Sequence, residues 1–203
     1  MLASHDSYTY QKARNPFVQL IKSFWRTQKK TIEEQYALGV RIFDVRVSSF
    51  KKDGHIQWRT AHGLAKFNRT FNSLESICSY FEYTFPNSII RIYLEDNKPS
   101  DEVLTEYLRQ ASIISEVHAN MIWEIGTHYP WKPYFTNKEF QIKEYYCHLF
   151  NWNPDKSVWY NLKHFDWSSR SLPAYSKKHN PEITKEMIDD PNVLHFMDYI
   201  GVY

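Results

Sequence analysis

Short β-rich runs alternate with longer helical runs along this chain, and this alternation limits the possible folds more than any other feature of the sequence. A strand–helix–strand succession favours a parallel sheet, because the helix carries the chain back to the edge at which the next strand begins. The runs predicted to be strands are 1–4, 40–47, 55–62, 88–95, 121–125, 140–146, 157–162 and 193–200. Eight parallel strands in one domain predict an α/β barrel.

Helical patterns lie between several of these strands. The most regular covers 100–117, where Ser100 is a suitable N-cap and apolar residues repeat along one face. Further helices are predicted over 16–38, 73–85 and 181–188. We therefore expect residues 1–203 to form a single α/β domain, a compact and distorted TIM-type (β/α)8 barrel in which some helices are short or missing. The alternative is an open doubly wound sheet, although no glycine-rich phosphate loop follows an early strand.

Composition excludes several classes of protein. With 42% apolar and 24% charged residues, the chain is not wholly disordered. Its 25 Lys and Arg against 23 Asp and Glu leave a net charge of +2, so we expect no nucleic-acid partner. The sequence shows neither a membrane-spanning apolar run nor a signal peptide, and it leaves the compartment open.

Ionisable side chains follow the predicted strands at their carboxyl ends, which is where the active residues of an α/β barrel lie. The residues that this rule brings to one rim include His5, Asp6, Asp44, Arg46, His62, Glu95 and Asp198. Closure of a barrel places the first strand beside the last, so Asp198 is expected to accept a hydrogen bond from a ring nitrogen of His5. Two histidines on opposite sides of a phosphate suit general base and general acid catalysis, and an arginine between them stabilises negative charge.

Simpler interpretations of the same residues stay open. Arg46 could form a purely structural ion pair with Asp44 or with Glu95, because a buried charge needs a partner. Nine histidines raise the question of a metal, but the sequence contains neither HxH nor HExxH spacing. We therefore predict no histidine-rich metal site.

Three segments together resemble the catalytic X-domain of phosphatidylinositol-specific phospholipase C, and its bacterial single-domain branch most closely. They are LASHDSYTY (2–10), ALGVRIFDVRV (37–47) and AHG (61–63), and VLHFMDYIG (193–201) is similar to the last strand of that family. The resemblance implies a distorted α/β barrel enzyme that cleaves the glycerol–phosphate bond of phosphatidylinositol. In that reaction the inositol 2-hydroxyl attacks its own phosphate, which releases diacylglycerol and forms inositol 1,2-cyclic phosphate. Slow hydrolysis of the cyclic product follows.

The resemblance also implies a catalytic role for individual residues. His5 matches the general base, and Asp198 matches its carboxylate partner. His62 matches the general acid, which Asp6 supports. Arg46 matches the arginine that, in the bacterial branch, takes the place of the metal used by the calcium-dependent branch.

The residues around Arg46 bear on the cofactor. The calcium-dependent branch carries Asn after the first His and two acids on the second strand, where this chain has Asp6, Asp44 and Arg46. A guanidinium in a cation site excludes calcium by charge and volume, so no cofactor is predicted, with calcium as the alternative. Glu95 resembles the remaining calcium ligand, and we expect it instead to pair with Arg46 or to bind a substrate hydroxyl. The residues predicted to bind the headgroup are Asp44, Glu95, His128, Glu144 and Tyr146.

Aromatic residues make up 17% of the chain and gather in segments 129–135, 149–153 and 165–169, which follow predicted strands. Amphipathic rings at the active rim would dock the protein on a bilayer without spanning it, whereas the alternative is ordinary loop packing. The interfacial candidates are Trp131, Tyr134, Phe135 and Trp152. The expected partners are a phosphatidylinositol-type headgroup and, transiently, a membrane surface, and we expect the protein to be a monomer.

Two other functions compete with this one. The first is a phosphodiesterase that acts on another lipid or on a glycerophosphodiester. The second is a non-catalytic barrel that only binds anionic headgroups. A cyclic product forms only where a hydroxyl neighbours the phosphate, so its detection distinguishes phosphatidylinositol cleavage from cleavage of another phosphodiester. Two titratable histidines argue against a barrel that only binds headgroups.

Overall fold

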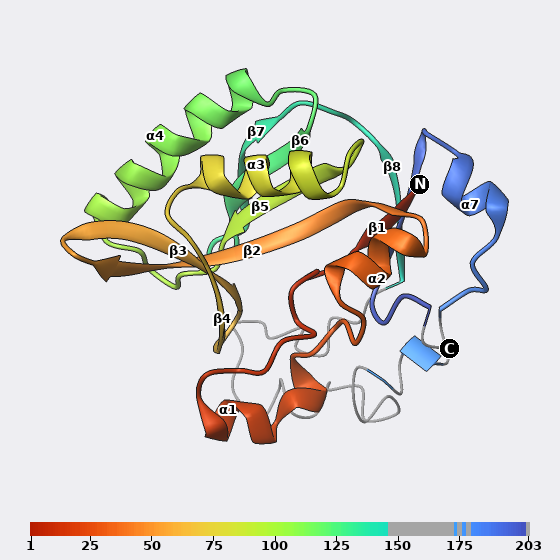
Figure 1. Cartoon of the computed structure of the whole chain (residues 1–203), viewed down its shortest axis with the longest axis horizontal. Helices are drawn as coiled ribbons and strands as arrows, with labels where there is room; N and C mark the ends of the chain where they lie inside the picture. The colour runs from red at the N-terminus through yellow and green to blue at the C-terminus, as the bar shows by residue number, and fades with distance from the viewer. Residues whose placement is uncertain (146–172, 174–175, 178–179, 202–203) are drawn as a thin grey trace.

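The structure is a computed structural model that describes residues 1–145, 173, 176–177 and 180–201 (Figure 1). Tyr146, Trp152 and the predicted strand 157–162 lie outside the described residues. The strands of the described part are β1 (Leu2–Ser4), β2 (Val40–Lys52), β3 (His55–His62), β4 (Ala65–Phe71), β5 (Ile89–Leu94), β6 (Ile122–Thr127), β7 (Lys132–Thr136), β8 (Gln141–Tyr145) and β9 (Val193–Met197). The helices are α1 (Pro16–Leu20), the 3-10 helix η1 (Lys22–Phe24), α2 (Ile32–Ala37), α3 (Leu74–Thr84), α4 (Asp101–Val117) and α7 (Lys185–Asp189).

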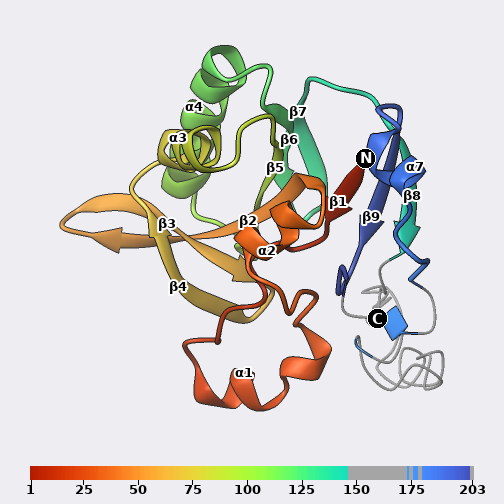
Figure 2. The same cartoon turned by 45° about the vertical axis from the view of Figure 1, so that its right-hand side comes forward.

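All these strands belong to one sheet that curls into a half-barrel, in the order β7-β6-β5-β2-β1-β9-β8 (Figures 1 and 2). The strands from β6 to β8 in that order run parallel to one another. Ser4 of β1 pairs with Phe43 of β2 on one side and with Met197 of β9 on the other. The first and last strands are therefore neighbours, and the distorted barrel fold that the sequence predicts is confirmed.

Three strands depart from the predicted parallel order. The run 55–62 is antiparallel to β2 rather than parallel, and β4 continues this antiparallel arrangement. The reason is the two-residue loop Asp53–Gly54, in which both residues have positive φ, because so short a loop joins only antiparallel strands. The sequence analysis missed β4 as well as β7, which folds back antiparallel on β6.

Two helices begin at their predicted caps, and two predictions need correction. Ser73 and Ser100 cap α3 and α4. The predicted helix over 16–38 is instead divided into α1, η1 and α2, and a capping box between Thr31 and Glu34 starts the last of these. The predicted helix over 181–188 begins only at Lys185, after the N-cap Thr184, because a threonine side chain satisfies a backbone N–H at that point.

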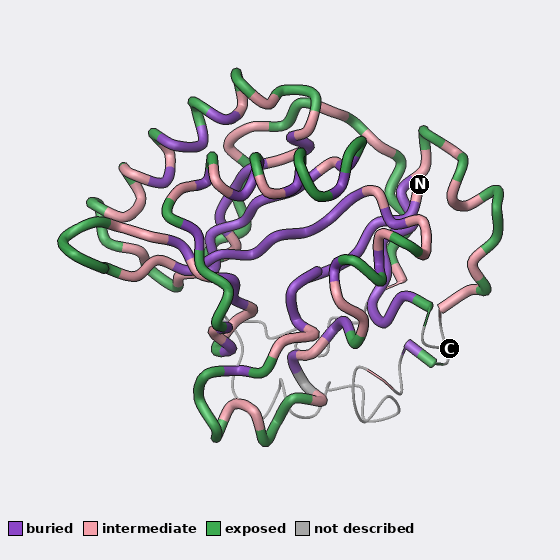
Figure 3. Tube along the Cα trace, in the orientation of Figure 1, coloured by how far each residue is buried: buried purple, intermediate pink, exposed green. Residues whose placement is uncertain are grey.

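The alternation of side chains along the strands separates the core from the polar interior of the half-barrel. On β2, Phe43, Val45 and Val47 face the main apolar core, which α3 and α4 cover. The intervening Asp44 and Arg46 point to the other face, into the curve of the sheet. A smaller apolar cluster, which includes Trp123 and Phe196, fills the bottom of that curve. Figure 3 shows these central strands buried and the outer helix faces exposed. Among the described helices, none has the length and apolar content needed to cross a membrane.

Replacing Gly126 with alanine is expected to destabilise the fold. A Cβ at this position would collide with the carbonyl oxygen of Lys132 and would lie 2.8 Å from the ring of Tyr93. Overpacking of this kind lowers the free energy of unfolding by about 1–3 kcal/mol. Urea unfolding measures the loss, with Ser112→Ala on the exposed face of α4 as the control. An unchanged midpoint in Gly126→Ala would contradict the close approach of β7 to β6.

Candidate active site

Four strands bring the five predicted catalytic residues together at one end of the curled sheet. His5 and Asp6 follow β1, and Asp198 follows β9 on the neighbouring strand. Arg46 lies within β2, and His62 ends β3. Asp6 has a φ of 45°, a left-handed conformation that aspartate tolerates, and its turn directs the chain back across the strand ends.

His5 is arranged as a neutral base. Its Nδ1 lies 2.7 Å from Oδ1 of Asp198, which is fully buried. Because a carboxylate only accepts, Nδ1 donates to Asp198, while Nε2 lies 3.4 Å from Nη2 of Arg46 and 3.3 Å from Oδ2 of Asp6. Burial, followed by the positive charge of Arg46, holds the pKa of His5 well below its usual value. The predicted His5–Asp198 hydrogen bond is thus confirmed.

His62 lies against the same Asp6 oxygen as His5, but its other ring nitrogen has a different partner. Its Nδ1 lies 2.6 Å from the main-chain oxygen of Trp25, and its Nε2 lies 3.0 Å from Oδ2 of Asp6. Both neighbours are acceptors, so each ring nitrogen of His62 faces a hydrogen-bond acceptor. Burial raises the pKa of Asp6, while Arg46 and His62 oppose that rise. The two histidines therefore share Oδ2 of Asp6, and only His5 is also beside Arg46.

Arg46 is surrounded by three buried carboxylates. Its Nε lies 2.8 Å from Asp6, its Nη2 lies 3.0 Å from Asp44, and its Nη1 lies 2.9 Å from Glu95. Burial acts to raise the pKa of Asp44, but Arg46 and then Arg91 hold it well below its usual range. For Glu95, burial is likewise outweighed by a hydrogen bond from His128 and by Arg46, so its pKa is also lowered. The predicted contacts of Arg46 with Asp44 and with Glu95 are both confirmed.

A possible set of metal ligands overlaps with this arginine cluster. One donor atom each from His5, Asp6 and Asp44 lies within 4.8 Å of the others. The guanidinium of Arg46 approaches all three, with its Nη2 at 3.4 Å from Nε2 of His5. The negative charge that would attract a divalent ion is thus already paired with the chain's own cation.

The predicted headgroup residues are only partly gathered here. Nδ1 of His128 lies 2.9 Å from Oε1 of Glu95, so both stand beside Arg46. Both oxygens of Asp44 are taken up by Arg46 and Arg91, which fits positioning of the arginines better than the predicted contact with substrate. Glu144 is exposed on β8 in register with Phe196, whose ring lies 5.5 Å from that of His5.

The aromatic segment 129–135 is not the loop that the sequence analysis predicts. Its second half belongs to β7, where Phe135 packs against the main core and Tyr134 is half-buried. Trp131 is half exposed and stacks on Tyr93 with 4.3 Å between ring centroids. The Trp131 ring centroid lies 5.5 Å from Cζ of Arg46, so this indole forms a wall of the site as well as part of its rim.

The sequence analysis missed two residues that support the site. Arg91 is buried and donates from Nε to Asp44 at 3.1 Å. Its signal was a charged residue at an inward position of the otherwise apolar run SIIRIYLE. Trp25 acts through its main-chain oxygen, and a main-chain contact has no signature in the sequence.

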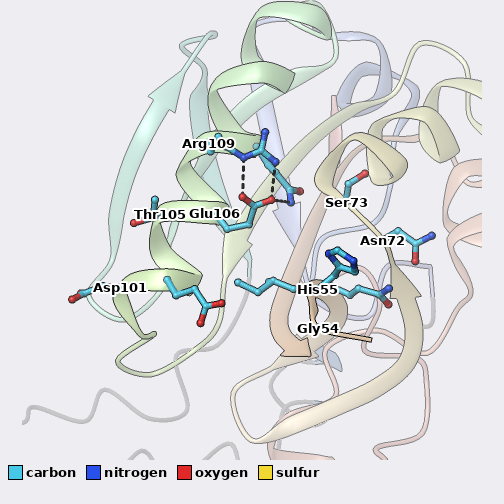
Figure 4. Close-up of a pocket in the computed structure, with 12 residues that line it drawn as sticks. Gly54, His55, Asn72, Ser73, Asp101, Thr105, Glu106 and Arg109 are labelled. Carbon is cyan, nitrogen blue, oxygen red and sulfur yellow. Dashed lines mark hydrogen bonds and ion pairs between the residues drawn. The ribbon is translucent and has the colours of Figure 1, made fainter. Parts of the chain in front are cut away.

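An open groove of about 910 Å³ lies elsewhere, at the end of β3 opposite to His62 (Figure 4). His55, Asn72 and the first half of α4 line it. Its charged side chains include Arg109, which pairs with Glu106 at 2.7 Å. None of the predicted catalytic residues lines this groove, so it is separate from the cluster around His5 and His62.

Solved structures of bacterial phosphatidylinositol-specific phospholipase C share this fold. The enzyme from Listeria monocytogenes aligns with a TM-score of 0.58 and 14% identity over 98% of this chain and 87% of that one. The enzyme from S. aureus aligns with a TM-score of 0.55 and 16% identity over 100% and 86% of the two chains. No protein-family model matches the sequence, and no relative was found among curated proteins. The likeness is therefore one of fold.

The ring of His5 is expected to stay neutral at pH 6.5, because burial and Arg46 lower its pKa in the folded protein. As the pH falls below 6.5, His5 is protonated in the unfolded state while it is still neutral in the folded state. Acidification through this range therefore lowers the free energy of unfolding. Carbon and nitrogen NMR of the histidine rings measures the titration, with His5→Gln used to assign the resonance. A midpoint at or above 6.5 would contradict the arrangement.

Proposed function

We propose that this protein is a phospholipase C-type phosphodiesterase that cleaves the glycerol–phosphate bond of phosphatidylinositol. The observation that carries the proposal is the pairing of a base-like and an acid-like histidine whose ring centroids lie 6.3 Å apart. That separation allows both rings to reach one phosphoryl group, with Arg46 beside His5. The shared fold of the bacterial enzymes supports the same function.

The first step is an intramolecular attack. Nε2 of His5 takes the proton of the inositol 2-hydroxyl, whose oxygen forms a bond to phosphorus. Arg46 stabilises the negative charge that grows on the non-bridging oxygens. The bond from phosphorus to the glycerol oxygen breaks, and His62 protonates that oxygen as diacylglycerol leaves. The product is inositol 1,2-cyclic phosphate, which water opens in the reverse sense, with His62 as base and His5 as acid.

The reaction is proposed to need no metal ion. Arg46 supplies a fixed positive charge next to His5 and is held by carboxylates that would otherwise be ligands. Protonated guanidinium does not dissociate at neutral pH, so the charge is permanent. Membrane association is likewise proposed to be peripheral, with the half-exposed Trp131 and Tyr129 at the rim of the site.

A phosphodiesterase for a different alcohol is the second candidate. It is favoured by one observation: Glu95 is buried and already paired with Arg46 and His128, so the partly exposed His128 ring is what this side offers to an alcohol, and an imidazole suits a range of polyols, not inositol alone. Only a substrate with a hydroxyl next to its phosphate gives a cyclic product, so the product decides between the two.

Phosphorus NMR of the products tests the proposed function. With phosphatidylinositol vesicles and excess EDTA, we expect the resonance of inositol 1,2-cyclic phosphate to appear at the rate seen without chelator. Calcium added back should change nothing, because Arg46 occupies the cation position. Loss of turnover in EDTA that calcium restores would overturn metal independence, and a linear phosphate as the first product would overturn the mechanism.

Separate alanine substitutions of His5 and His62 test their proton-transfer roles. Each is expected to lower kcat by about 10²–10⁴-fold, the usual range for general acid–base groups. His62→Ala should recover much of its loss on an analogue with a phenol leaving group, which departs without protonation, whereas His5→Ala should not. His55→Ala is the control, because this exposed histidine lies at the other end of β3. Equal recovery in both variants would remove the assignment of acid and base.

A further inference from the structure

Arg91, like Arg46, is a buried arginine that pairs with Asp44. It lies on β5 in register with Asp44 of β2. Its Nε donates to Oδ1 of Asp44 at 3.1 Å, and its Nη2 donates to Oδ2 at 2.9 Å. Two parallel bonds of this kind match the planar fork of an arginine to both oxygens of a carboxylate. Within the part of the chain that the structure describes, Asp44 is the one ion-pair partner of Arg91.

Asp44 connects Arg91 to the groups that are proposed to react. Its Oδ2 accepts from both Nε and Nη2 of Arg46, at 3.0 Å each. The same oxygen accepts from the main-chain N–H of Asp6 at 3.2 Å, in the turn that carries His5. Among the described residues, its Oδ1 accepts a hydrogen bond only from Arg91. The orientation of this carboxylate, and with it the position of Arg46, therefore depends on Arg91.

Arg91 also changes the balance of charge around Arg46. Three carboxylates surround that one guanidinium, and their excess weakens the field that Arg46 offers to negative charge growing on a phosphate. By pairing with Asp44, Arg91 reduces this excess. Its charge also acts on His5. Burial and then Arg46 hold the pKa of His5 well below its usual value, and Arg91 acts in the same direction, whereas Asp44 opposes them.

Aromatic rings surround the guanidinium of Arg91. Its Cζ lies 4.7 Å from the ring centroid of Phe196, 5.1 Å from that of Trp123, and 5.2 Å from those of Tyr93 and Trp131. Rings at these distances attract a cation, and a planar guanidinium stacks on them better than a flexible ammonium group does. The rings therefore hold Arg91 in the position from which it pairs with Asp44.

We propose that Arg91 is a positioning residue for phosphodiester cleavage, which orients Arg46 and the turn of His5 through Asp44. The proposal rests on the function proposed above and assigns a further residue to the same site. The contacts of Arg91 are with a carboxylate and with aromatic rings, so it acts through Asp44. A purely structural role would only fasten β5 to β2, and its loss would then lower stability without changing the reaction.

Kinetics of Arg91→Met and Arg91→Lys test the positioning role, with phosphatidylinositol in detergent micelles as substrate. Arg91→Met removes the charge and should lower kcat by about 10–100-fold, the usual loss when a group that orients a charged ligand is removed. A residue that bound the substrate itself would change KM as well. Arg91→Lys keeps the charge without the fork and should recover part of the loss. Wild-type kcat in a folded Arg91→Met variant would overturn the proposal.

Arg41→Met is the matched control. Arg41 lies near the start of the same strand as Asp44, where it donates to main-chain oxygens and its Cζ lies 4.1 Å from the ring centroid of Tyr36. Its loss removes an arginine that contacts a ring outside the site, so kcat should stay at the wild-type value. Thermal unfolding shows which variants fold.

A double-mutant cycle tests the path through Asp44. Asp44→Asn alone should lower kcat. Adding Arg91→Met to it should change kcat further by no more than about twofold, because the carboxylate through which Arg91 acts is then already absent. Losses that multiply in the double variant would overturn this path.

Histidine NMR gives a second measurement, which needs no substrate. Ionisable groups from several elements face His5: Asp198 after β9, Arg46 and Asp44 on β2, His62 at the end of β3, Asp6 in the same turn, and Arg91 on β5. Removing one positive charge in Arg91→Met should raise the titration midpoint of His5, and the acidic limb of kcat/KM should move to higher pH with it. An unchanged midpoint would indicate a structural role alone and would overturn the proposal.

Two further outcomes are decided by the same measurements. If Arg91→Met does not fold, Arg91→Lys is the test: its His5 midpoint should match the wild type while its kcat falls, and a wild-type kcat would overturn the proposal. If the wild-type protein cleaves no phosphodiester, the proposed function is refuted, and the midpoint in Arg91→Met still shows whether Arg91 acts on His5.

Discussion

A buried guanidinium surrounded by three carboxylates is the interaction on which the rest of the site depends. An unpaired charge in a protein interior is costly, and removing one partner of a buried ion pair costs about 3–5 kcal/mol. Arg46 pairs with carboxylates from three places in the chain: the turn after β1, β2 itself and the end of β5. The pairs with Asp6 and Glu95 fix the ends of β1 and β5 relative to β2. The ion pairs therefore define the shape of the site as well as its charge.

The same cation lies beside only one of the two histidines. His5 lies 3.4 Å from Arg46 and is buried, so its protonated form is disfavoured. His62 does not approach Arg46 directly. Asp6 lies between them, with one oxygen on the guanidinium and the other on the imidazole. The same oxygen of Asp6 also lies 3.3 Å from Nε2 of His5, so one carboxylate connects both imidazoles to the guanidinium, while only His5 lies directly against the positive charge.

The sequence predicts contacts that follow from strand order and misses those that follow from turns. His5 meets Asp198 because the first and last strands of a curled parallel sheet are neighbours, and the alternation along β2 brings Arg46 to Glu95 at the end of β5. The pairing of β2 with β3 depends on a turn instead. The loop residues Asp53 and Gly54 favour an antiparallel hairpin, whereas the alternation of strands and helices along the chain favours parallel strands. The contact of Arg91 with Asp44 could be predicted only by knowing which side chains of β5 face the interior of the half-barrel. A short, almost wholly apolar strand lacks the polar–apolar alternation that would identify that face.

The contact of His62 with the main chain of Trp25 explains why no motif marks the partner of the acid-like histidine. A carbonyl oxygen is present whatever the side chain is, so its position depends on how the chain is held. The Trp25 indole donates to Val18 at 2.8 Å and packs on Phe67, and these contacts hold the carbonyl in place. The element that orients His62 therefore extends to α1, whose exposed apolar residues face away from the core. Thr27 and Gln28, which follow Trp25, both donate to the main-chain oxygen of His5 at 3.1 Å, so this one segment contacts both histidines.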